Sequence, residues 1–145
     1  MTTIIKIALL SIALLSTASA DVYLCKTPVK GINIVDHYWL LTSKFERAMW
    51  NDQHTKISDV PFLTDVAVRN EEYHPDALCQ RQLYVSEKKV NDQLPLHKKL
   101  GKWSPWNNCQ TFALSVLRNA ANDPRFKSRD NKETYPAWVK RSSLK

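Results

Sequence analysis

The chain begins with an apolar segment that has the pattern of a secretory signal peptide. Lys6 precedes an apolar run at residues 7–15, and Ala18-Ser19-Ala20 has the small side chains of a cleavage site. The run is shorter than the roughly 18 apolar residues that a membrane helix needs, and no later segment reaches that length. We therefore expect residues 1–20 to be removed on export to the periplasm or the medium. Of the 145 residues, removal of these 20 leaves 125, residues 21–145, which suffice for one core and a single domain.

Composition excludes several classes of function. With only two glycines, Gly31 and Gly101, the chain has no glycine-rich phosphate loop and no dinucleotide-binding fingerprint. Lysine and arginine number 21 against 14 aspartate and glutamate, a formal net charge of +7, and residues 122–145 form a basic tail. This excess favours anionic neighbours such as cell-wall polymer, lipid headgroups or nucleic acid, although a solvated basic face is its commoner meaning.

The cysteines and histidines argue against a metal site. The three cysteines contain no C-x-x-C pair, and the four histidines form neither H-E-x-x-H nor another close ligand pair. We therefore expect no metal and no cofactor. An oxidising compartment would pair two of the three cysteines and leave one thiol, which is either intermolecular or reactive.

Segments rich in β-branched and aromatic residues predict a sheet. Residues 21–26 are expected to form a short strand, and residues 31–42 form a second one with Val35, His37 and Trp39 on one side. Residues 44–50 fit either the return strand of a hairpin or a short helix.

The middle of the chain is less regular. Short strands are expected at 55–60, 61–63 and 64–69, with Pro61 as a break, and residues 79–85 and 88–96 are left undecided. Glu71 and Glu72 would face opposite sides of a strand and are interpreted as part of a solvated turn. Residues 97–102 are interpreted as a basic connector, and the tail around Trp138 as loosely packed or a last strand.

One amphipathic helix is clearly predicted, from residue 108 to about residue 120. Asn107 is a suitable N-cap, Gln110 completes a capping-box pattern, and Pro124 lies beyond the end. An apolar stripe at helical spacing is formed by Phe112, Ala113, Val116, Leu117 and Ala120.

This helix places Cys109 at its second position, on the apolar face. Free N–H groups and the positive end of the helix dipole stabilise a thiolate there and lower the thiol pKa. If the sheet presents a histidine to this thiol, the pair forms an activated nucleophile, and His37 is the leading candidate for the base. In the competing interpretation Cys109 is a small buried apolar residue and His37 a core histidine beside Trp39.

Two short patches resemble a known family. The strand sequence Asp36-His37-Tyr38-Trp39, followed much later by Trp106-Asn107-Asn108-Cys109-Gln110-Thr111-Phe112 at a helix start, resembles the circularly permuted NlpC/P60-type papain-like thiol enzymes. That group includes the lecithin:retinol acyltransferase-like proteins, and in it the histidine strand precedes the cysteine helix. The two patches cover a small part of the mature chain.

The resemblance implies an α+β fold of the permuted papain-like type, a small antiparallel sheet packed against the cysteine helix. Cys109 would be the nucleophile and His37 the general base, and a third polar residue on the next strand would orient the imidazole. His54 is the preferred third residue, and its rivals are Asp52, Gln53 and Asp65.

Two further expectations depend on this resemblance. The oxyanion would be bound by the Cys109 backbone N–H and by a side-chain donor, Asn108 or Gln110. Cys25 and Cys79 would then form a disulfide.

The expected function is that of an exported, monomeric cysteine-dependent hydrolase or acyltransferase that acts on an amide or ester bond through an acyl-enzyme. Its substrate would be an anionic polymer such as peptidoglycan, or in second place a lipid ester. The alternative is a secreted, non-catalytic binding or inhibitory module with an aromatic-lined groove and a basic surface. Trp103 and Trp106 would either line the substrate site or pack in the core. Binding to nucleic acid ranks last, because export and the lack of a recognisable module argue against it.

Overall fold

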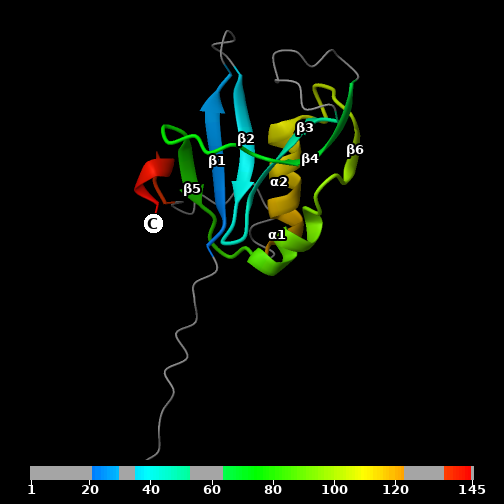
Figure 1. Cartoon of the computed structure of the whole chain (residues 1–145). Helices are drawn as coiled ribbons and strands as arrows, with labels where there is room; N and C mark the ends of the chain where they lie inside the picture. Colours follow the sequence, from blue (N-terminus) through cyan, green and yellow to red (C-terminus); the bar gives the residue numbers. More distant parts are fainter. Residues whose placement is uncertain (1–20, 30–34, 53–63, 123–135, 145) are drawn as a thin grey trace, which may run out of the picture.

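The computed structural model describes residues 21–29, 35–52, 64–122 and 136–144. They form a seven-stranded antiparallel sheet, ordered β6-β4-β3-β2-β1-β5-β7, and two α-helices (Figure 1). The predicted α+β class, with an antiparallel sheet against the cysteine-bearing helix, is confirmed, whereas the expected signal peptide lies outside the described residues. The strands are β1 (Tyr23–Pro28), β2 (Asp36–Leu41), β3 (Glu46–Asn51), β4 (Asp65–Asn70), β5 (Leu78–Arg81), β6 (Lys99–Lys102) and β7 (Val139–Lys140), and the helices are α1 (Glu87–Gln93) and α2 (Cys109–Ala120).

The sheet has two apolar faces. On one face Leu24, Leu40 and Val68 pack against Val90 of α1 and against α2, which contacts β2 and β3. The predicted stripe of α2 faces this core: Ala113, Val116, Leu117 and Ala120 are buried, and Phe112 is partly buried. Figure 1 shows α2 running along this face of the sheet. The packing therefore fixes the N-terminus of α2, and Cys109 with it, against the sheet.

Strands β2 and β3 form a hairpin, so residues 44–50 contain a return strand and not a helix. The turn is closed by Thr42, whose Oγ1 accepts hydrogen bonds from the N–H groups of Lys44 and Phe45 at 3.2 and 3.3 Å. Such side-chain-to-backbone bonds are characteristic of Ser and Thr in turns. The hairpin places Trp39 opposite Ala48.

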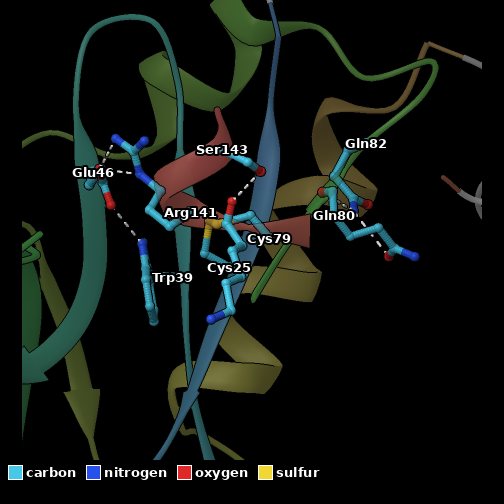
Figure 2. The surroundings of a disulfide bond; sticks show 9 residues. Cys25, Trp39, Glu46, Cys79, Gln80, Gln82, Arg141 and Ser143 are labelled. Atoms are coloured by element: carbon cyan, nitrogen blue, oxygen red, sulfur yellow. Dashed lines mark hydrogen bonds and ion pairs between the residues drawn. A yellow bond between two sulfur atoms is a disulfide. The ribbon is translucent and has the colours of Figure 1, made fainter. Parts of the chain in front are cut away.

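The opposite face of the sheet is held by a disulfide. Cys25 and Cys79 are direct cross-strand partners on β1 and β5, and their sulfur atoms are bonded at 2.03 Å, which confirms the expected pairing. The short 3-10 helix η3 (Arg141–Ser143) lies beside them. Figure 2 shows Arg141 reaching Glu46, which accepts a hydrogen bond from Trp39 at 3.0 Å. The C-terminal end of the chain therefore braces the face from which Trp39 projects.

The structure differs from the prediction in one segment and assigns the segments that the sequence left undecided. Residues 97–102, predicted as a connector, contain strand β6, because Lys99 and Lys102 pair with residues of β4. The Lys102 side chain forms an ion pair with Asp65 at 3.0 Å, and that of Lys99 forms one with Asp52. The undecided segments overlap β5 and α1, each of which begins one residue earlier, and the tail contains β7 and η3. In the described ranges no helix is long and apolar enough to cross a membrane.

Candidate functional site

The site is built at the start of α2. The N-cap is Asn108, whose side chain accepts a hydrogen bond from Thr111 N at 3.0 Å, while the Asn108 N–H donates to Thr111 Oγ1 at 2.9 Å. The predicted capping box of Asn107 and Gln110 is thus one residue too early, and Cys109 is the first residue of the helix. Asn107 instead shapes the preceding loop, donating through Nδ2 to the carbonyl groups of Leu100 and Lys102, both at 2.8 Å.

A gap in strand pairing lies beside this helix start. β2 pairs with β3 only from Trp39 to Leu41, whereas β3 stays paired with β4 as far as Asn51. The first half of β2 therefore has no β3 partner, and its backbone groups on that side are available to another element. Cys109 is the residue that meets them.

The thiol of Cys109 contacts the unpaired backbone of β2. Its Sγ atom lies 4.0 Å from the Asp36 carbonyl oxygen, and the backbone N–H groups of Tyr38 and Gln110 hydrogen-bond to the sulfur. Cys109 is 8% exposed and packs against Met49 and Val66. The sulfur is thus held in a buried position with N–H donors aimed at it.

His37 reaches the same place from the other side of the sheet. The His37 ring stacks on the ring of Trp39, with 5.7 Å between the ring centroids. The His37 centroid lies 4.6 Å from that of the Trp50 ring. The Nε2 atom is 2.8 Å from Glu71 Oε2, whereas the buried Nδ1 atom makes no hydrogen bond to any described residue. Because Glu71 holds Nε2, Nδ1 is the ring nitrogen left to interact with Cys109.

Glu71, just beyond the end of β4, completes the group. Its side chain is 1% exposed, and its carboxylate also accepts a hydrogen bond from Trp50 Nε1 at 2.8 Å and contacts His74 Nε2 at 3.1 Å. The interpretation of Glu71 as part of a solvated turn is therefore wrong. The carboxylate is instead the direct partner of His37.

The three groups shift one another's pKa values. Burial lowers the pKa of His37, but its interactions with Cys109 and Glu71 outweigh burial and raise that pKa to about 9. Burial raises the pKa of the Cys109 thiol, yet His37 and the two backbone N–H groups bring it below its ordinary value. Burial also raises the pKa of Glu71, and the contacts with His37, Trp50 and His74 reverse that change. The arrangement favours a thiolate beside an imidazolium, with a carboxylate behind it.

Of the rivals predicted for the third site residue, Asp52 and Asp65 lie away from His37 and are paired with other side chains. His54 and Gln53 are outside the described residues, so the preference for His54 stays a prediction. Asp52 pairs with Arg69 at 2.9 Å and with Lys99, and Asp65 pairs with Lys102. The group bonded to His37 is the Glu71 carboxylate.

The two proposed oxyanion donors differ in availability. The Asn108 side chain already makes two hydrogen bonds, because its Oδ1 caps the helix and its Nδ2 donates to the Pro105 carbonyl at 2.9 Å. Gln110 is exposed on the first turn of α2. The N–H of Cys109 is one of the helix-start donors that have no intrahelical partner.

The tryptophans before the cysteine have different environments. Trp103 is partly buried against the cluster of Met49, Val66 and Cys109. Trp106, at the tip of the Ser104–Asn107 turn, is 86% exposed. All five tryptophans belong to the described residues, and Trp106 alone is exposed while Trp39 is fully buried.

Within the described ranges there is no group of three or more His, Cys, Asp or Glu side chains that could hold a metal ion. Comparisons of the chain with protein-family models, with curated proteins and with solved structures find no match.

Proposed function

We propose that the protein is a cysteine-dependent hydrolase or acyltransferase acting on an amide or ester bond. Cys109 is the nucleophile, His37 the general acid and base, and Glu71 the residue that orients His37. The observation that carries this proposal is the state of the His37 ring, with Nε2 on a buried carboxylate and Nδ1 unpaired beside the thiol at a helix start. A core histidine would be expected to have both ring nitrogens satisfied.

The reaction follows from these positions. The Cys109 thiolate attacks the carbonyl carbon and forms a C–S bond, and the tetrahedral oxyanion is bound by the Cys109 N–H and by the Gln110 side chain. As the C–N or C–O bond breaks, the His37 imidazolium gives its proton to the leaving amine or alcohol. His37 then removes a proton from water or from an acceptor alcohol or amine, whose oxygen or nitrogen displaces the thiolate.

The order of the elements fits a circularly permuted papain-like fold, since the histidine strand β2 precedes the cysteine helix α2. An exported enzyme that has lost Lys6 with residues 1–20 keeps 20 lysine and arginine against 14 aspartate and glutamate, a formal net charge of +6, and is suited to an anionic polymer such as peptidoglycan, with a lipid ester as the second substrate class. Trp106 is exposed in the turn that leads into Cys109 and is in a position to contact that substrate.

The test is capture of the acyl-enzyme. The mature chain is incubated with peptidoglycan fragments or with phospholipid vesicles, and each cysteine peptide is weighed by mass spectrometry. We expect an acyl adduct on Cys109, none in Cys109→Ala, and slower formation in His37→Ala. Turnover that persists in Cys109→Ala, or the absence of any adduct and turnover with both substrate classes, would contradict the proposal and favour the binding module.

A further inference from the structure

A second histidine holds the far side of the Glu71 carboxylate. His37 Nε2 and Trp50 Nε1 both contact Oε2, at 2.8 Å each, whereas Oε1 is contacted by His74 Nε2 at 3.1 Å. The His74 side chain is 39% exposed and that of Glu71 is 1% exposed. His74 therefore lies between the buried carboxylate and the solvent.

The position of His74 is fixed from two sides. Its ring lies 5.6 Å from the ring of Trp39, which also stacks on His37. Its carbonyl oxygen accepts a hydrogen bond from Ala77 N at 3.1 Å, and the C-terminal segment holds the next residue through a bond from Ser142 N to the Pro75 carbonyl at 3.1 Å. A side chain restrained in this way can restrain its own partner.

We propose that His74 is a positioning residue that donates a hydrogen bond to Glu71 Oε1, shields the carboxylate from water, and so keeps Oε2 on His37. The inference rests on the proposed function and adds a fourth residue to it. Without His74, Oε1 loses its donor and water reaches the carboxylate. Hydration raises the local dielectric constant, which weakens the attraction between Glu71 and His37.

The neighbouring charged groups are engaged elsewhere. Glu46 is paired with Arg141, whose guanidinium also lies over the Tyr73 ring at 5.1 Å, and Asp76 is paired with Lys140 at 3.4 Å. Glu72 is exposed next to Glu71. His74 is therefore the charged or titratable side chain, besides His37, that contacts Glu71 in the described residues.

The experiment is an NMR titration of the His37 ring in the mature chain and its variants. His74→Ala removes the donor, His74→Gln retains an N–H donor, and Glu72→Gln is the matched control in the same loop. We expect the pKa of His37 to fall from about 9 toward its ordinary 6.5 in His74→Ala. In His74→Gln and Glu72→Gln it should stay near the wild-type value.

Each other outcome has a distinct meaning. An unchanged or higher His37 pKa in His74→Ala would overturn the positioning role, and an equal fall in His74→Gln would overturn the role of the N–H donor. A wild-type His37 that titrates at its ordinary value would instead contradict the proposed Cys-His pair itself. Thermal unfolding of each variant verifies that the fold is intact.

Discussion

At the scale of single residues, the Glu71 carboxylate acts together with the Cys109 thiol to raise the pKa of His37. It is buried, it contacts His37, Trp50 and His74, and its pKa is held below the ordinary value by these contacts. A buried carboxylate in this setting remains charged and stabilises the protonated imidazole. The role proposed for Cys109 depends on this carboxylate as much as on the thiol.

Glu71→Gln is expected to abolish this effect with little change in shape. The neutral amide does not stabilise the His37 imidazolium, so the pKa of Cys109 should rise and turnover should fall by about 100-fold, a typical loss of general acid–base catalysis. The measurement is the rate of turnover of the substrate identified by acyl-enzyme capture. Glu72→Gln, which changes the exposed neighbour, is the control, and equal losses in both variants would contradict the role of Glu71.

The pH profile of turnover on an amide substrate should be bell-shaped. Activity rises as Cys109 loses its proton, at a pH below the thiol's ordinary pKa of 9.0. Since the pKa of His37 is raised to about 9, the imidazolium that protonates the leaving amine exists below that pH and is lost above it. The profile of kcat/KM against pH checks both limbs. Activity that only increases through pH 9 would show that His37 does not act as the acid.

Single residues also show where prediction from the sequence stops. Cys109 and His37 were identified from a helix-start cysteine and from alternation along a strand, both of which are local patterns. Glu71 contacts His37 across 34 residues of sequence. Glu71 and Glu72 look alike in the sequence, and only the register of β4 against β3 determines which of them faces inward.

At the scale of elements, the start of α2 depends on its cap. Asn108→Ala removes the side-chain acceptor for Thr111 N and should lower the free energy of unfolding by about 1 kcal/mol. Denaturant unfolding measures this change, with Gln110→Ala on the same exposed turn as the control. A loss in Gln110→Ala as large as that in Asn108→Ala would contradict the assignment of the cap.

Elements with strong periodicity were predictable, and those stabilised by pairing were not. The apolar stripe of α2 and the face of β2 that carries His37 and Trp39 follow from their spacing. Strand β6 consists of Lys99, Leu100, Gly101 and Lys102, a poor strand sequence, and it forms by pairing with β4, with Asp52 and Asp65 beside its lysines. Such a strand depends on a partner that the local sequence does not reveal.

At the scale of the whole molecule, the disulfide packs against Trp39, whose ring stacks on His37. The Cys25–Cys79 bond closes a sequence separation of 54 residues, for which the chain-entropy model gives a stabilisation of about 4 kcal/mol. The double variant Cys25→Ala/Cys79→Ala should therefore unfold at lower denaturant concentration. While it is folded, its Cys109 should alkylate as in the wild type, and altered alkylation would contradict a purely stabilising role of the disulfide.

The fold class and the pair of Cys109 and His37 were predictable from the sequence, but the gap in strand pairing through which the two side chains meet was not. The core of α2 packs on the face of the sheet that carries Leu40, whereas His37 projects from the opposite face with Trp39. The two side chains interact because β2 and β3 stop pairing at Trp39. This gap depends on how β2, β3 and β4 pair with one another, and the sequence of a single strand does not predict it.

Activation of Cys109 by His37 is tested by the alkylation rate of Cys109 as a function of pH. The rate is measured in the folded chain by peptide mass spectrometry, for the wild type and for His37→Ala. We expect Cys109 of the wild type to react with a pKa below the ordinary thiol value, and we expect His37→Ala to raise this pKa. A Cys109 that reacts only after unfolding, or whose pKa is the same in both proteins, would contradict this activation.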